Sequence, residues 1–87
     1  MRSLFAGLIL GLAPLFALAG PIDINVADAV TIAAELDGVG LSRAQAIVDY
    51  RDKHGLFVEP RDIMNVKGVG PQIFEANRKN ILINRDG

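Results

Sequence analysis

The chain has 87 residues, of which nine are basic, ten are acidic, one is histidine and none is cysteine. This length gives room for one small domain. The missing cysteines exclude a disulfide framework and a Cys/His metal cluster, so a metal site would need carboxylates alone.

The N-terminal segment differs from the rest of the chain. Arg2 precedes an uncharged apolar run over residues 4–16, and small residues follow up to Ala19. This pattern predicts a signal peptide at residues 1–19 and export of the remaining chain. The alternative is a membrane anchor, but the run is shorter than the roughly 20 residues that span a bilayer. Cleavage would leave 87 − 19 = 68 residues with eight basic and ten acidic side chains, a net charge of −2.

Two helices are predicted in the first half of the remaining chain. Asp28 is a suitable N-cap for a helix over residues 29–36, in which apolar residues recur at helical spacing. Ser42 is a suitable N-cap for a second helix, which should end at Gly55. The side chains expected to face the core are Ala29, Ile32, Ala33, Leu36, Ala44, Ile47 and Val48.

Two further helices are predicted in the second half. Glu59 and Pro60 suit the N-cap and first position of a short third helix, and Pro71 suits the start of a fourth helix running to about Asn80. Phe57, between the second and third helices, should plug the core. The tail that begins at Ile81 is predicted to leave the domain as an extended end.

The phrase GVG occurs twice, at residues 38–40 and 68–70, and the offset is 68 − 38 = 30 residues. Each copy lies between two predicted helices, so the chain reads as two copies of a helix-hairpin-helix unit, at about 29–53 and 59–80. Both glycines of each copy are expected to have positive φ. The valine between them should point into the core, and the bare backbone beside a helix N-terminus should favour an anion such as phosphate.

The residues around these hairpins resemble the tandem helix-hairpin-helix domain, most closely that of the ComEA-type periplasmic DNA receptors of bacterial transformation. The segments that carry the resemblance are IDINVADA at 22–29, LDGVGLSRAQAIVDYR at 36–51, HGLFVEPRDIMNVKGVG at 54–70 and FEANRKNI at 74–81. It implies an all-α, compact (HhH)2 domain of four to five short helices, similar to the SAM fold.

The resemblance also implies a function. Such proteins bind double-stranded DNA with little sequence preference, through hairpin amides that contact phosphates across the minor groove. They coat incoming DNA cooperatively and pass it to an inner-membrane channel. No enzymatic activity, cofactor, metal or small-molecule substrate is implied.

The resemblance assigns DNA-binding residues to both hairpins. Asp37 occupies the position that Lys67 holds in the second copy, so the first hairpin should bind phosphate more weakly. Asn77 lies one repeat offset after Ile47, so the repeat predicts an apolar residue at this position. The candidate DNA-binding residues are Lys67, Gly68, Val69, Gly70 and Gln72 in the second unit, Gly38, Val39, Gly40, Ser42 and Arg43 in the first, and Arg78 and Lys79 near the end.

The net charge of −2 predicts weak, salt-sensitive binding, with a slope of log affinity against log salt of about −2 to −4. The scattered acidic residues do not resemble a nuclease site, and His54 is expected to be an ordinary helix-end residue. The remaining alternative is a protein-interaction module that does not bind DNA. Paired hairpins of this kind also occur in an extrinsic subunit of cyanobacterial photosystem II, where their task is structural.

Overall fold

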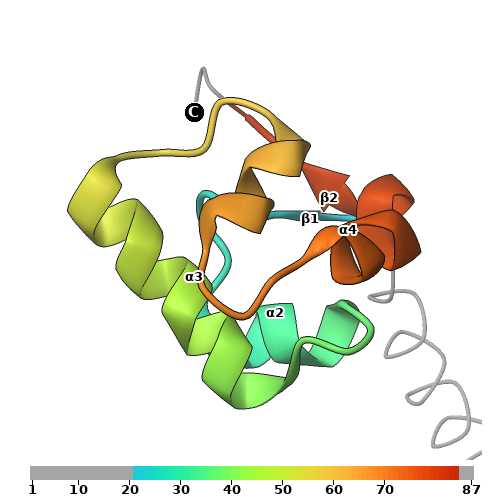
Figure 1. The fold of residues 1–87 in the computed structure, drawn as a ribbon. Coiled ribbons are helices and arrows are strands. Elements are labelled where there is room, and N and C mark those ends of the chain that lie inside the picture. Colours follow the sequence, from blue (N-terminus) through green and yellow to red (C-terminus); the bar gives the residue numbers. More distant parts are fainter. Residues whose placement is uncertain (1–20, 85–87) are drawn as a thin grey trace, which may run out of the picture.

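The computed structural model describes residues 21–84, and the predicted signal peptide lies outside them. The described chain is mostly helical, as the sequence predicts (Figure 1). None of its helices is long and apolar enough to cross a membrane. In chain order the elements are β1 (Ile22–Asp23), α2 (Ala29–Glu35), α3 (Gly40–His54), the 3-10 helix η1 (Pro60–Asn65), α4 (Pro71–Asn77), the 3-10 helix η2 (Arg78–Asn80) and β2 (Ile81–Leu82).

The first two helices begin in different ways. The Asp28 carboxylate accepts a hydrogen bond of 2.8 Å from the Thr31 backbone N–H, which confirms the predicted N-cap of α2. The same bond lowers the pKa of Asp28 below its ordinary value. The predicted N-cap at Ser42 is wrong. Helix α3 begins at Gly40 and has no side-chain cap, because the glycine turn leads directly into the helix and places Ser42 inside its first turn.

The third predicted helix is a 3-10 helix, with Glu59 as its N-cap and Pro60 at its first position as expected. The Glu59 N–H donates to the Asp62 carboxylate over 3.1 Å, so a side chain inside the helix accepts a hydrogen bond from the backbone N–H of the N-cap residue. The fourth helix is α-helical to Asn77 and continues as a 3-10 turn to Asn80.

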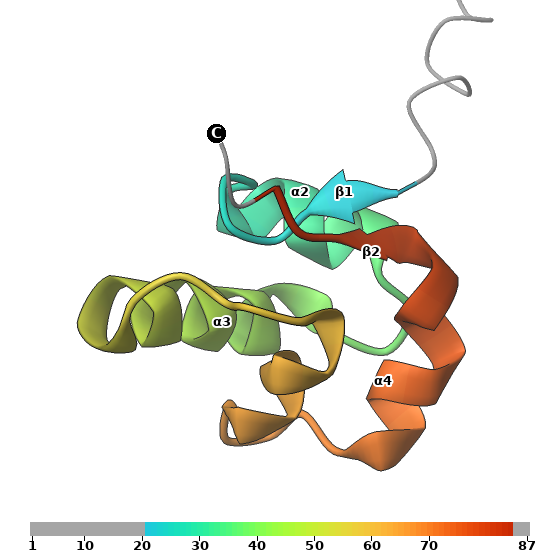
Figure 2. The ribbon, with the colours of Figure 1, turned by 90° about the horizontal axis from the view of Figure 1, so that it is seen from above.

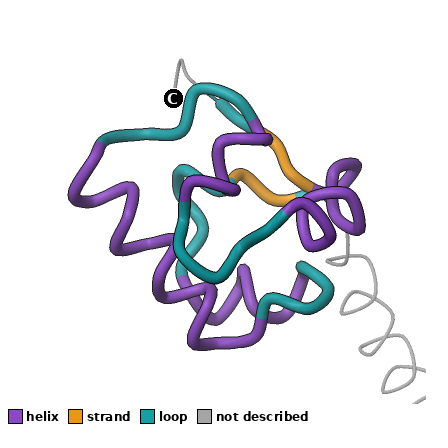
Figure 3. Tube along the Cα trace, in the orientation of Figure 1, coloured by secondary structure: helices purple, strands orange, loops and turns teal. Residues whose placement is uncertain are grey.

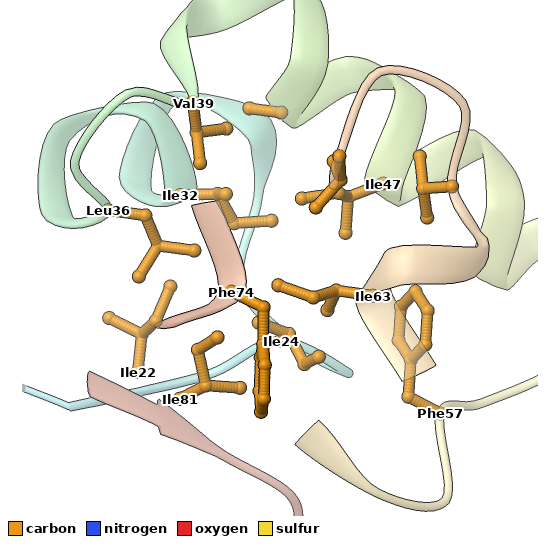
Figure 4. Packing of buried hydrophobic residues seen from close by; sticks show 13 residues of the cluster. Ile22, Ile24, Ile32, Leu36, Val39, Ile47, Phe57, Ile63, Phe74 and Ile81 are labelled. Carbon is orange, nitrogen blue, oxygen red and sulfur yellow. The ribbon is translucent and has the colours of Figure 1, made fainter. Parts of the chain in front are cut away.

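The core gathers side chains from every element except η2 (Figure 4). Phe57 is only 2% exposed and closes the core as predicted, stacked on Tyr50 with ring centroids 5.4 Å apart. Ala33 and Val48 are half-buried at its margin. The buried hydrophobic residues are Ile22, Ile24, Ile32, Leu36, Val39, Ala44, Ile47, Phe57, Ile63, Val66, Val69, Phe74 and Ile81.

The prediction that the tail leaves the domain is wrong for its first residues. Strand β2 pairs in parallel with β1, with Ile22 opposite Ile81, and the two strands lie side by side in Figures 2 and 3. The Ile24 N–H extends this pairing with a bond of 3.3 Å to the Leu82 carbonyl. Ile81 is only 4% exposed, so burial of its side chain holds the tail against the domain.

Two polar side chains tie the segment after β1 to the rest of the fold. Asn25 is 6% exposed, and its amide group accepts from the Phe57 N–H at 2.8 Å and donates to the Phe57 carbonyl at 3.0 Å. Arg51 of α3 donates to the carbonyls of Ile24 and Ala27. These bonds satisfy backbone groups that belong to no helix or strand pair.

Candidate nucleic-acid interface

The first hairpin, residues 36–40, connects α2 to α3. Gly38 and Gly40 have φ of +76° and +65°, the left-handed region that glycine enters without strain. Val39 is 1% exposed and anchors the turn in the core, as predicted. No side chain of the described residues caps α3, so the first backbone amides of this helix have no side-chain acceptor at the cap.

The second hairpin, residues 66–70, connects η1 to α4. Gly68 has a φ of +96°, but Gly70 has a φ of −107°, so the expectation of positive φ at both glycines is wrong here. Gly70 needs no special backbone angle because it already has the extended conformation of an N-cap. A Cβ added to it would meet no atom within 4 Å, so the backbone at Gly70 is open to a ligand.

Val69 anchors the second hairpin rather than facing its open side. Its side chain is 4% exposed, and its N–H donates to the Val66 carbonyl over 3.0 Å. The open surface of this hairpin is therefore made by its neighbours, with Lys67 and Gly68 exposed and Gly70 half-buried.

Each hairpin is approached by the helix that follows the other hairpin. Arg43 of α3 donates from Nε to the Gly68 carbonyl over 2.7 Å. In the opposite direction, a Cβ added to Gly38 would lie 3.9 Å from Cγ1 of Ile73. Positions 43 and 73, like 38 and 68, differ by the repeat offset of 30. The two approaches therefore join equivalent positions of the two units, although the first is a hydrogen bond and the second is an apolar approach.

Asn77 fixes the entry to the first hairpin. Its Oδ1 accepts from the Asp37 N–H at 2.7 Å, and its Nδ2 donates to the carbonyls of Asp37 and Ile73 at 2.9 and 2.8 Å. The side chain is 0% exposed. Asn77 is thus a buried clamp on the hairpin backbone. The signal for it in the sequence is the polar residue at a position where the repeat predicts an apolar one.

The remaining polar candidates lie at the surface. Ser42 and Gln72 occupy equivalent places in the first turns of α3 and α4, and both are exposed. Arg78 lies 3.3 Å from the Glu75 carboxylate and 5.7 Å from the centre of the Phe74 ring, so its guanidinium already makes an ion pair and a ring contact. Lys79 is exposed in η2.

Acidic side chains lie near both hairpins. Asp37 is exposed beside the first. Asp49 lines a shallow hollow of about 240 Å³ together with Lys53 and Lys67, so it moderates the positive charge beside the second hairpin. Glu59 lies 3.9 Å from Arg61, which partly neutralises it. Across residues 21–84, no three His, Cys, Asp or Glu side chains are grouped closely enough to hold a metal ion.

The comparisons with known proteins agree with this geometry. The helix-hairpin-helix motif family matches residues 19–82. The chain belongs to the helix-hairpin-helix family. It is 41% identical over 61 residues to an uncharacterized protein of Haemophilus influenzae, an alignment that covers 70% of this chain and 54% of that protein.

Two further relatives match parts of this chain. The chain is 40% identical over 48 residues to ComE operon protein 1 of Bacillus subtilis, covering 55% of this chain and 23% of that protein. It is 34% identical over 65 residues to human S1 RNA-binding domain-containing protein 1, covering 75% of this chain and 6% of that protein. The chain therefore matches about half the length of the first relative and smaller parts of the others.

Proposed function

We propose that this protein binds double-stranded DNA without sequence preference and serves as an exported receptor for DNA uptake in natural transformation. The observation that carries the proposal is the pair of glycine hairpins, each approached by the helix that follows the other, through Arg43–Gly68 and Gly38–Ile73. The helix that follows each hairpin has no side-chain cap. Kinship with ComE operon protein 1 supports the role in DNA uptake.

Phosphate is the chemical group that suits this surface. Backbone N–H groups at a hairpin and at the start of a helix can bind a phosphate. Every nucleotide carries the same phosphate, so such contacts do not depend on the base sequence. Lys67 is exposed beside the second hairpin and adds a positive charge. In the first hairpin Asp37 takes the equivalent place, so the second hairpin supplies more of the affinity.

The cellular part of the proposal follows from the N-terminal sequence. A signal peptide at residues 1–19 would deliver the domain to the periplasm. There, cooperative coating of incoming DNA would oppose its backward movement, and the DNA would pass to an inner-membrane channel. The protein needs no cofactor or enzymatic activity for this role.

The test is fluorescence anisotropy with a labelled 20-base-pair duplex and residues 20–87, which include every buried residue of the described chain. We expect binding that weakens with salt at a slope of about −2 to −4. Lys67→Gln should reduce the magnitude of that slope by about 1 and weaken binding to all sequences equally. The matched control is Arg61→Gln, which removes one exposed positive charge from η1.

Two outcomes would contradict the proposal. If the folded wild type does not bind duplex DNA at low salt, the protein-interaction alternative replaces it. If Arg61→Gln weakens binding as much as Lys67→Gln, binding reflects overall charge and not the hairpin. Incubation of DNA with the protein and magnesium should leave the DNA intact, and cleavage would restore an enzymatic interpretation.

A further inference from the structure

One hydrogen bond joins the two hairpins through a side chain. Arg43, in the first turn of α3 next to the first hairpin, donates from Nε to the Gly68 carbonyl of the second hairpin at 2.7 Å. The Arg43 side chain also covers Gly68, since a Cβ there would lie 3.6 Å from Nε and 3.7 Å from Cγ. The two residues are 25 positions apart in the chain, so the bond links the two repeats.

The two hairpins are held by different means. Asn77 clamps the backbone of Asp37 at the start of the first hairpin. Among residues 21–84 the second hairpin has no such clamp, because the residue equivalent to Asn77 is Ile47, which is apolar and buried. The buried Val69 side chain anchors this hairpin in the core, and the carbonyl of the exposed Gly68 accepts the hydrogen bond from Arg43.

The chemistry of arginine suits this task beside a phosphate. An exposed carbonyl oxygen repels an anion, and a hydrogen bond from a guanidinium offsets that repulsion. The guanidinium has five N–H donors, and the bond to Gly68 uses one of them. The remaining donors and the positive charge stay next to the hairpins.

We propose that Arg43 is a positioning residue that fixes the second hairpin relative to the first and thereby favours duplex over single-stranded DNA. This inference rests on the proposed function. Two phosphates on opposite strands of a duplex have a fixed separation, so a fixed pair of hairpins loses little freedom on binding them. A single strand is flexible and adapts to hairpins whether or not their separation is fixed.

Two substitutions separate the hydrogen bond from the charge. In Arg43→Lys the positive charge stays, but a methylene group replaces Nε at the same distance along the side chain. In Arg43→Gln the amide nitrogen occupies the position of Nε and can donate to the Gly68 carbonyl, but the charge is lost. The control is Arg61→Lys, a charge-conserving change at an exposed position in η1.

Each variant is measured for binding to a 20-base-pair duplex and to a single strand of the same length, over a range of salt concentrations. We expect Arg43→Lys to lose about tenfold in duplex affinity with an unchanged salt slope and little change for the single strand. Arg43→Gln should weaken both equally, keep the duplex preference and reduce the magnitude of the slope by about 1.

Backbone amide spectra of the DNA-free proteins give a second measurement. Arg43→Lys should shift the amide signals of residues 67–70 and speed their hydrogen exchange, whereas Arg43→Gln and Arg61→Lys should not. If Arg43→Lys leaves these amide signals unchanged, or if its preference for duplex over single-stranded DNA stays within about twofold of the wild type, the inference is overturned while the proposed function stays intact. A wild type that binds no DNA would overturn both.

Discussion

Removal of the Asn77 side chain should destabilise the domain through its hydrogen bonds to the first hairpin. Asn77→Ala deletes three bonds, of 2.7, 2.9 and 2.8 Å, from a position that is 0% exposed. At roughly 1 kcal/mol each, their loss should lower the free energy of unfolding by about 3 kcal/mol. For a domain of this size, that corresponds to a fall in melting temperature of about 12 to 24 °C.

The assay is thermal and urea unfolding of residues 20–87 followed by circular dichroism. Asn77→Leu is the second variant to measure, because it places at this position the apolar side chain that the repeat predicts but makes none of the three hydrogen bonds. The control is Asn65→Ala at an exposed position, which should change stability by less than about 0.5 kcal/mol. A loss below about 1 kcal/mol in Asn77→Ala, or a leucine variant as stable as the wild type, would refute the reasoning.

Three other predictions concern the hairpin glycines, the first helix cap and the tail. Gly68→Ala should cost about 1–2 kcal/mol because its φ is +96°, whereas Gly70→Ala should cost less than about 0.5 kcal/mol; equal losses in thermal unfolding would contradict this difference. The folded-state pKa of Asp28 is lowered mainly by a backbone N–H that donates to it, so its stabilisation is present above the unfolded pKa of about 3.9 and is lost as the pH falls through the lower folded pKa. Urea midpoints measured from about pH 5 to 2 should therefore fall less steeply for Asp28→Asn, and identical slopes would argue against a titrating cap. Ile81→Ala should cost about 2–5 kcal/mol in urea unfolding, and Leu82→Ala, at a site 51% exposed, less than about 0.5; comparable losses would mean that the tail is not held by its buried side chain.

Local signals predicted the helices well. An aspartate before an apolar stripe marked the start of α2, and Glu59–Pro60 and Pro71 marked η1 and α4, because caps and proline act over one turn of chain. Phe57 was expected in the core on the general behaviour of aromatic residues, and it is there. The glycine phrase located both hairpins because each is a local turn.

Two of the features that the sequence did not predict depend on contacts distant along the chain. Strands of two residues, such as Ile22–Asp23 and Ile81–Leu82, are too short to show a period of two, and their pairing joins the ends of the described chain. The bond from Arg43 to Gly68 depends on how the repeats pack, which no local pattern encodes. The negative φ at Gly70 was missed because a glycine in the sequence does not reveal which of its allowed conformations it adopts.

The parallel pairing of β1 with β2 has a mechanical consequence. Tension applied between the two ends of the domain pulls β1 from Ile22 and β2 from Leu82, and these pulls are opposite in direction along neighbouring strands. The strand bonds and the adjoining bond from Ile24 to Leu82 then bear the load together in shear instead of opening one after another. A domain tethered at one end and pulled at the other would thus resist unravelling where the described part of the chain begins and ends.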